Sequence, residues 1–232
     1  MSADDDANAA TLATYEQAAE TYRARSDRDD GPDWEIDAVG LVRTHAEAGA
    51  SVLEIGSGPG WDADRLEAAG FRVRRTDATR AFVEMQRAHG HTADLIDVRR
   101  DSLTGPGGER YDAVLANAVL LHIDRAELPA VLGRLSGAVH LGGVLVATVK
   151  AGDGEAWSRQ KMDLPRHFVY WRAGPLAEVV ASSGWSVVSL DEVERPAGPW
   201  LMLVARRSSQ TDMASTPSPA TERPAPTTAG AV

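Results

Sequence analysis

The sequence contains no cysteine, no apolar run long enough to cross a bilayer and fewer basic than acidic residues. The absence of cysteine excludes a disulfide framework, a thiolate nucleophile and a cysteine-ligated zinc site. The longest apolar stretch, around residues 113–123, is interrupted by Asn117 and His122 and is shorter than the roughly 20 residues that span a membrane. We therefore expect a protein without a membrane-spanning segment.

The charge balance narrows the range of partners. The 34 Asp and Glu residues exceed the 24 Lys and Arg residues, which gives a formal net charge of −10. A surface of this sign repels phosphate backbones and disfavours a nucleic-acid partner. The chain begins with the acidic run Asp4-Asp5-Asp6, whereas a secretory signal begins with positive charge and an apolar segment. We therefore expect a cytoplasmic protein with neither nucleic acid nor membrane as its partner.

Composition divides the chain into one domain and two terminal segments. A chain of 232 residues, 43% of them apolar, can bury one substantial core, and two full domains would be cramped. Residues 208–232 are mostly Ser, Thr, Pro and Ala, which bury too little apolar area to offset the entropy lost on ordering. We predict a flexible acidic segment over residues 1–10, a folded domain over 11–207, and a disordered tail over 208–232, for which docking on a partner is the alternative.

Segments typical of strands and helices alternate through this domain. Strands rich in Val, Leu and Ile are predicted over 51–55, 72–76, 92–96, 111–117, 143–150, 185–193 and 200–206. Helices are predicted around 12–22 and 36–46 ahead of the first strand, and over 61–69, 79–89, 128–139 and 175–184 between the strands. The repeated strand–helix units predict an α/β fold with a doubly wound, mostly parallel seven-stranded sheet and an antiparallel edge strand.

A glycine-rich turn, Gly56-Ser57-Gly58-Pro59-Gly60, connects the first predicted strand to the helix that begins at Trp61. Such a turn lets a ligand approach the backbone and lie against a helix N-terminus. A dinucleotide-binding fingerprint needs a third glycine at the position of Trp61, where helix and strand pack closely. The indole at this position argues against NAD as the ligand.

Three carboxylates accompany this turn at the ends of predicted strands. Glu54 stands in a strand expected to be buried, where an unpaired charge is costly, so its partner is either a ligand cation or an arginine such as Arg23 or Arg25. Asp77 closes the second strand at about the spacing at which an acid binds ribose hydroxyls. Asp97 follows the third strand, where it could accept a hydrogen bond from an adenine amino group. Both aspartates could instead cap strand ends.

In their order along the chain, these motifs resemble those of the class I S-adenosylmethionine-dependent methyltransferases. The motifs are Glu54–Gly60 (EIGSGPG), Asp77–Thr79, Asp97, Tyr111–Asn117 (YDAVLAN) and Leu141–Gly143, and the resemblance covers about residues 15–206. It implies a Rossmann-like methyltransferase fold, S-adenosylmethionine as the cofactor and S-adenosylhomocysteine as its product. It also implies that the glycines of the turn pass under the methionine part of the cofactor.

The resemblance implies further roles in the cofactor site. Glu54 would serve the cofactor amino group and Tyr22 its carboxylate. Asp77 would hold the ribose, and Asp97 with the Val98 amide would hold the adenine. The complete set of cofactor-binding residues implied in this way is Tyr22, Glu54, Gly56, Ser57, Gly58, Gly60, Asp77, Ala78, Asp97, Val98 and Asn117.

Methyl transfer from a sulfonium is an in-line displacement, which needs alignment of the reactants and exclusion of water but no metal. A base is needed only when the acceptor still carries a proton. His122, five residues after Asn117, and His167 are the candidate bases. A polar residue hydrogen-bonded to the backbone is the alternative reading of His122. The histidines are scattered along the sequence and indicate no metal site.

The segment 151–172 is longer than the usual connection of about 2–6 residues between a strand and a helix, and we predict that it forms a lid. Its aromatic residues Trp157, Tyr170 and Trp171 are candidates for substrate binding, or they pack the lid against the domain. The sequence thus predicts a metal-independent methyltransferase of secondary metabolism, monomeric or homodimeric, that methylates an O or N atom of a small molecule. The alternatives are methylation of tRNA or protein, and a non-catalytic cofactor-binding module that regulates a partner.

Overall fold

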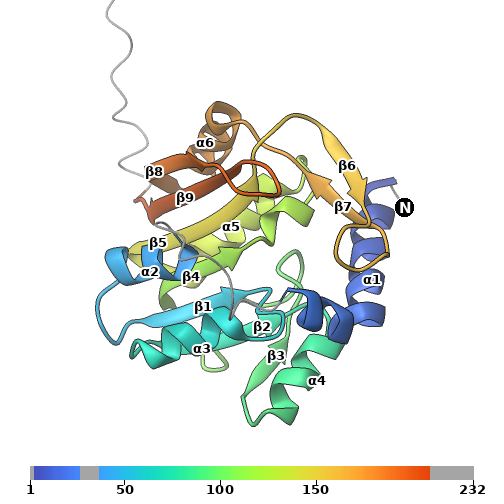
Figure 1. Ribbon diagram of the computed structural model, residues 1–232. Helices are drawn as coiled ribbons and strands as arrows, with labels where there is room; N and C mark the ends of the chain where they lie inside the picture. The colour runs from blue at the N-terminus through green and yellow to red at the C-terminus, as the bar shows by residue number, and fades with distance from the viewer. Residues whose placement is uncertain (1–2, 27–36, 210–232) are drawn as a thin grey trace, which may run out of the picture.

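The computed structural model describes residues 3–26 and 37–209, so residues 210–232 of the predicted tail lie outside the described part of the chain. Its main element is a seven-stranded sheet with the strand order β3-β2-β1-β4-β5-β9-β8 (Figure 1). These strands are β1 (Ser51–Ile55), β2 (Arg72–Asp77), β3 (Ala93–Leu95), β4 (Tyr111–Asn117), β5 (Val139–Lys150), β8 (Trp185–Val193) and β9 (Trp200–Arg207).

The directions of the strands confirm the predicted fold class. Strands β1 to β5 are parallel to one another, whereas β9 is antiparallel to both β5 and β8. The antiparallel strand β9 lies between β5 and the edge strand β8. The physical reason is burial, because β9 has a run of buried residues from Leu201 to Ala205, whereas most of β8 is exposed or half-buried.

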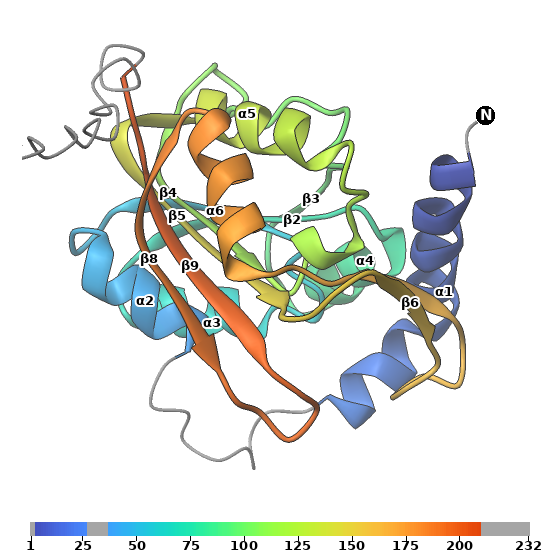
Figure 2. The same cartoon turned by 90° about the horizontal axis from the view of Figure 1, so that it is seen from above.

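Helices cover both faces of the sheet (Figure 2). On one face lie α2 (Ala38–His45) and α3 (Trp61–Ala68), and on the other lie α5 (Leu128–Ala138) and α6 (Ala173–Ser182). Alternate residues of each central strand supply the two cores. In β1, for example, Val52 belongs to the cluster that contains α2 and α3 residues, and Leu53 belongs to the cluster that contains α5 and α6 residues.

One strand begins earlier than its sequence predicts. β5 starts at Val139, directly after α5, rather than at Gly143. The pairing of β4 with β5 is irregular there, because Tyr111 faces Val139 but Ala113 faces Val144. Gly142, at φ +77°, takes up this irregularity in a backbone conformation that favours glycine.

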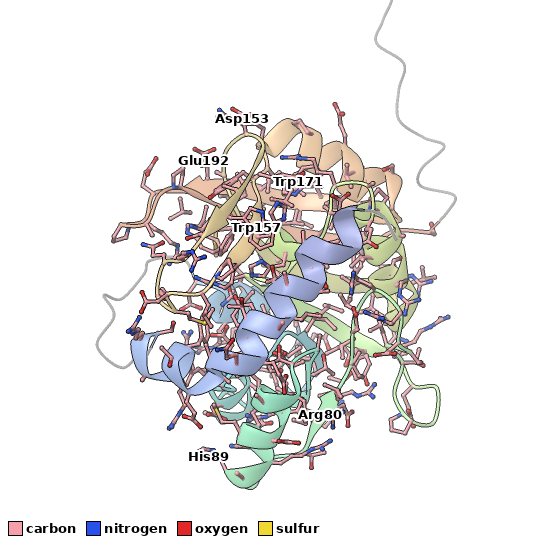
Figure 3. The ribbon with its side chains drawn as sticks, turned by 90° about the vertical axis from the view of Figure 1, so that its right-hand side faces the viewer. Arg80, His89, Asp153, Trp157, Trp171 and Glu192 are labelled. Atoms are coloured by element: carbon pink, nitrogen blue, oxygen red, sulfur yellow. The ribbon has the colours of Figure 1, made fainter. Side chains whose placement is uncertain are left out.

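A helix and a hairpin lie together at the carboxyl ends of the parallel strands (Figures 1 and 3). The predicted lid segment, 151–172, contains the antiparallel strands β6 (Glu155–Ser158) and β7 (Arg166–Val169). Helix α1 (Ala3–Arg25) packs against β7 and against α4 (Arg80–Ala88) and crosses the front of Figure 3. Two threonines join α1 to the hairpin: Thr14 Oγ1 donates to the Pro165 carbonyl at 2.6 Å, and Thr11 Oγ1 accepts the His167 N–H at 3.0 Å.

Helix α1 begins within the N-terminal segment 1–10, which the sequence led us to expect to be flexible. The side chain of Asn8 is buried, and its amide donates to the His122 carbonyl at 3.1 Å. This contact with a residue far along the chain gives the first turns of α1 a tertiary partner, which composition does not reveal. None of the described helices is both long enough and apolar enough to cross a membrane.

Candidate functional site

The glycine turn between β1 and α3 is built on left-handed backbone conformations. Gly56, Gly58 and Gly60 have φ angles of +65°, +52° and +96°. A Cβ atom on Gly56 would lie 2.5 Å from Cγ2 of Val119, and one on Gly60 would lie 2.9 Å from Nη1 of Arg75. A Cβ on Gly58 would meet no atom within 4 Å. The outer two glycines are therefore required by neighbouring side chains, whereas Gly58 leaves open space beside the backbone.

This turn forms one wall of a cavity at the carboxyl ends of β1 to β4. The other walls come from α1, from the loops after β2 and β3, and from the loop between β4 and α5, which contains the short helix η1 (Leu120–His122). The lining residues are Asn8, Thr11, Leu12, Tyr15, Tyr22, Ile55, Gly56, Ser57, Gly58, Pro59, Trp61, Asp62, Asp77, Ala78, Thr79, Phe82, Ile96, Asp97, Val98, Asn117, Ala118, Val119, His122 and Ile123. In an open α/β sheet, this edge is the usual ligand-binding position.

The carboxylate of Asp77 holds two loops of the cavity in place. It accepts the backbone N–H of Gly58 at 2.8 Å and that of Thr79 at 2.7 Å. Ser57 also links the glycine turn to β2, because its Oγ accepts the Thr76 N–H at 3.1 Å. Burial raises the pKa of Asp77, while both backbone hydrogen bonds act to lower it.

Glu54 is a buried acid without a cationic partner at one of its oxygens. Its side chain is 3% exposed, and Oε2 has no hydrogen-bond partner among the described residues. Burial and the neighbouring Asp62 raise the pKa of Glu54 to about 8. The alternative of pairing with Arg25 is wrong, because Arg25 donates to Asp163 at 2.8 Å on the hairpin. The groups that act on Glu54 are Ser57, Arg75, Asp62 and Asp77, and Arg23 is not among them.

Asp97 and Tyr22 line the cavity and also contact other protein side chains. Asp97 accepts hydrogen bonds from Arg99 and Arg100, which hold the pKa of its carboxyl below the usual value. The ring of Tyr22 packs edge-on against Tyr15, with 5.5 Å between the ring centroids. Both residues line the cavity and are held in place by these contacts.

Asn117 belongs to a chain of hydrogen bonds at the end of β4. Its amide donates to Asp62 Oδ2 at 2.6 Å, and its oxygen accepts from Thr148 Oγ1 at 2.7 Å. Thr148 Oγ1 also accepts the N–H of Ala118, which has the left-handed φ of +59°. This network fixes the turn that brings Val119 against Gly56.

His122 is hydrogen-bonded through both ring nitrogens. Its Nδ1 lies 2.6 Å from the His167 carbonyl, which can only accept, so Nδ1 carries the hydrogen. Its Nε2 lies 3.1 Å from Tyr15 Oη, and that hydroxyl also accepts from Arg166 Nη1 at 3.1 Å. Burial lowers the pKa of His122 to about 4, so its ring is neutral at physiological pH.

Comparison with known proteins agrees with this geometry. A family model described as "Methyltransferase domain" matches residues 35–190, which is more than half of the chain. The chain belongs to this methyltransferase family. The resemblance to the class I S-adenosylmethionine-dependent methyltransferases is therefore confirmed, and S-adenosylmethionine is the cofactor of the family. Among proteins with curated descriptions, none matches the chain by sequence.

Solved structures with low sequence identity share the methyltransferase fold. The 1,6-didemethyltoxoflavin-N1-methyltransferase of Burkholderia thailandensis, with bound 1,6-didemethyltoxoflavin and S-adenosylhomocysteine, has a TM-score of 0.71 and 20% identity over 90% of this chain and 92% of that one. The DhpI–SAH complex has a TM-score of 0.70 and 22% identity over 88% and 98% of the two chains. The [4+2]-cyclase SpnF has a TM-score of 0.63 and 16% identity over 84% and 94%. These likenesses concern the fold, which several activities share.

Most residues assigned to the cofactor by resemblance meet at the cavity of this methyltransferase domain. Tyr22, Gly56, Ser57, Gly58, Asp77, Ala78, Asp97, Val98 and Asn117 line it. Glu54 and Gly60 do not line it and lie next to residues that do. His122 also lines the cavity, and its backbone hydrogen bond is the one that the alternative reading of this residue expected.

The residues predicted on the lid do not line this cavity, and their role in substrate binding stays a prediction. His167 does not line the cavity, because strand alternation directs it to Glu155 and Trp157 on the other side of β7 from Phe168. Trp157, which is labelled in Figure 3, is 50% exposed and is also not among the residues that line the cavity. The lid aromatics at the end of β7 pack against the domain instead.

Tyr170 and Trp171 have these packing roles. Trp171 is buried in the main core, with the Arg125 guanidinium 4.4 Å from its ring. Tyr170 packs partly buried against the same core, and its carbonyl accepts from Arg125. Neither lines the cavity.

Three residues at or near the cavity were not among the site residues predicted from the sequence. Tyr15 and Asn8 lie on α1, and a signal for Tyr15 was available because it precedes Tyr22 by two helical turns and shares its face. Arg166 supports Tyr15 from the hairpin and is 6% exposed. Sequence offered no signal for Arg166, because its place depends on how the hairpin folds over α1.

Proposed function

We propose that the protein transfers a methyl group from S-adenosylmethionine to an O or N atom of a small molecule without a metal. The observation that carries this proposal is the buried carboxyl group of Glu54, whose Oε2 has no hydrogen-bond partner among the described residues, in the strand that leads into the glycine turn. A cationic amino group is the partner that such an oxygen requires. The open space beside Gly58 provides room for the ligand to approach the backbone.

The residues present fit the cofactor. Glu54 would bind its amino group, and Gly56 to Gly58 would lie along its methionine part. Asp77, already ordered by two backbone hydrogen bonds, would accept from the ribose hydroxyls. Asp97 and the Val98 amide would bind the adenine, and Tyr22 the carboxylate. When bound, the cofactor supplies an electrophilic methyl group on a sulfonium.

The protein contributes alignment and exclusion of water. Helix α1 and the loop containing η1 supply walls of the cavity in addition to the glycine turn. The hydrogen bonds of Asn117 with Asp62 and Thr148 hold the turn at the end of β4 rigid, which favours one orientation of the acceptor. His122 acts as a positioning residue for Tyr15 rather than as the base proposed from sequence, because both its nitrogens are engaged.

A small acceptor is supported by the cover over the site and by one structural relative. The cavity is roofed by α1, so a macromolecular acceptor would have to displace a packed helix. The Burkholderia thailandensis methyltransferase structure contains the small molecule 1,6-didemethyltoxoflavin. We therefore favour a small molecule over tRNA or protein, and the net charge of −10 points the same way for nucleic acid.

The experiment is methyl transfer with labelled S-adenosylmethionine and separate pools of small metabolites, tRNA and protein. We expect label in the small-molecule pool only. The matched variant is Glu54→Gln, which cannot ionise to pair with a cationic amino group but keeps the side-chain shape, and it should lower both cofactor affinity and labelling. Label in tRNA or protein would overturn the small-molecule acceptor. Tight S-adenosylhomocysteine binding with no label in any pool would favour a non-catalytic module or a different reaction on the same fold.

A further inference from the structure

Two cations near the cavity have no acidic partner in the described part of the chain. Arg166 is 6% exposed, and its hydrogen bonds go to the Tyr15 hydroxyl and to the Gln160 carbonyl at 2.6 Å. Its Nε is buried without any acceptor. Lys150, at the end of β5, is half-buried and forms no ion pair among the described residues. Neither side chain is therefore paired with a carboxylate of the described residues, although both are at least partly buried.

Both cations lie on the ring of Phe168. The Arg166 Cζ atom is 5.1 Å from the ring centroid, and Lys150 Nζ is 5.2 Å from it. The same ring lies 4.8 Å from the imidazole of His122, which lines the cavity. The positive charges thus stand directly behind the wall that Tyr15 and His122 form. Partial burial and the charge of Arg166 lower the pKa of Lys150, as expected for like charges held together.

Arg75, which is also buried, differs from Arg166 because it is paired with carboxylates. It is held by Asp64 and Glu67, each at 2.7 Å. The nearby carboxylates of the hairpin pair with other residues instead. Glu155 lies 3.3 Å from His167, and Asp163 pairs with Arg25. Burying a charged guanidinium without a carboxylate is costly, so an anion supplied from outside would offset that cost.

We infer that the methyl acceptor is a small organic acid, selected because its anionic group binds at the Tyr15–His122 end of the cavity in the positive potential of Arg166 and Lys150. Tyr15 lines the cavity and its hydroxyl accepts from Arg166, so only this side chain separates the Arg166 charge from the cavity. Carboxylate and phosphate-like oxygens share the chemistry that this arrangement recognises. The inference rests on the proposed function and specifies its acceptor.

The first test separates the small-molecule pool by anion exchange before incubation with labelled S-adenosylmethionine. We expect labelled product from the anionic fraction. Label from the neutral or cationic fraction alone would overturn the inference and leave the proposed function intact. Label from no fraction would overturn both.

The second test uses the labelled acceptor with single substitutions that remove one cation. Lys150→Met and Arg166→Gln should each raise the acceptor KM at least tenfold, while the affinity for S-adenosylhomocysteine stays within twofold of the wild type. Lys161→Met and Arg159→Gln are matched controls on the hairpin loop, with the same charge changes at exposed positions. We expect them to behave like the wild type.

Two results of this second test would overturn the inference. One is an unchanged acceptor KM in a folded Lys150→Met protein, and the other is a loss of S-adenosylhomocysteine affinity equal to the loss for the acceptor. The latter would assign the cations to the cofactor carboxylate. Circular dichroism checks that both variants fold. Arg166→Gln removes buried hydrogen bonds, so if this variant does not fold, the result for Lys150→Met alone tests the inference.

Discussion

Asp77 and Gly58 join the first two strands at the site, because the Asp77 carboxylate accepts the backbone N–H of Gly58 at 2.8 Å. The same carboxylate accepts the Thr79 N–H through its other oxygen. One side chain therefore orders the glycine turn after β1 and the loop after β2 before any ligand binds. Preorganisation of this kind reduces the entropy that a ligand must pay on binding.

The first prediction is that Asp77→Ala lowers S-adenosylhomocysteine affinity by tenfold to a hundredfold. The change removes the loop hydrogen bonds and the proposed ribose contacts, together worth roughly 1–3 kcal/mol. The affinity of Asp77→Asn should lie between those of the wild type and Asp77→Ala, because the amide oxygen of Asn can accept only some of these hydrogen bonds. Titration calorimetry measures both, with the exposed Asp153→Ala as control. Wild-type affinity in Asp77→Ala would show that the second strand has been assigned the wrong role.

The second prediction concerns Gly56 and Val119. Gly56→Ala places a methyl group 2.5 Å from Cγ2 of Val119 at a φ of +65°, so we expect a loss of unfolding free energy of about 2 kcal/mol or more. Adding Val119→Ala should restore part of that loss by removing the overlap, while the backbone cost remains. Urea unfolding measures the three variants. If the double variant loses as much unfolding free energy as the two single variants together, Gly56 and Val119 are not in contact.

The companion variant Gly58→Ala separates stability from binding at the same turn. Its methyl group meets no protein atom within 4 Å, so only the left-handed backbone cost of about 1 kcal/mol falls on stability. Because Gly58 lines the cavity, we expect the larger effect on S-adenosylhomocysteine affinity. An unchanged affinity would place the ligand away from the turn.

The third prediction is a pH-dependent gain of stability in Glu54→Gln. Burial raises the folded-state pKa of Glu54 from 4.5 to about 8, so the native state keeps a proton that the unfolded state loses over this interval. The contribution of Glu54 to stability is thus fully present below pH 4.5 and is lost as the pH rises toward about 8.

Glutamine does not titrate, so the stability difference in its favour should grow with pH to on the order of 1–4 kcal/mol near pH 8. Chemical unfolding at several pH values measures the difference. The same variant should bind S-adenosylhomocysteine at least tenfold more weakly. A difference that is constant with pH would show that Glu54 is already ionised in the free protein.

The fourth prediction tests His122 as a base. Because burial lowers its pKa to about 4 and both nitrogens are hydrogen-bonded, it does not titrate near neutral pH. The pH profile of kcat at saturating cofactor should therefore have the same shape in His122→Gln as in the wild type between about pH 5.5 and 8. We expect kcat to fall by less than a hundredfold. Loss of a limb of the profile in the variant would restore His122 as the base.

The fifth prediction contrasts two tryptophans of the lid. Trp171 is 3% exposed and stacks under Arg125, so Trp171→Ala should cost about 3–5 kcal/mol of unfolding free energy. Trp157 is 50% exposed, and its replacement by Ala should change stability by less than about 1 kcal/mol. Thermal unfolding and acceptor KM measure both variants. A raised acceptor KM in a stable Trp157→Ala protein would return the outer face of the hairpin to the substrate site.

The sequence by itself determined the sheet and the cofactor end of the site. The strands near β1 and β4 were predictable because Val, Leu and Ile runs between glycines specify buried parallel strands. The glycine turn and Asp77 were predictable because a turn and a strand end are local features. Residues such as Gly58 therefore appear at the cavity where their motif placed them.

Only the tertiary structure decided the arrangement at the Tyr15–His122 end of the cavity. Whether His122 is a base or a neutral hydrogen-bonded residue depends on burial and on the carbonyl of His167, which is 45 residues away. Arg166 donates to Tyr15, which is 151 residues away in the sequence. Arg166 rather than His167 lies beside the cavity wall because of the face of β7 that packs against α1. Such contacts arise when distant segments pack, and no local pattern encodes either their partners or the loss of solvent that sets each pKa.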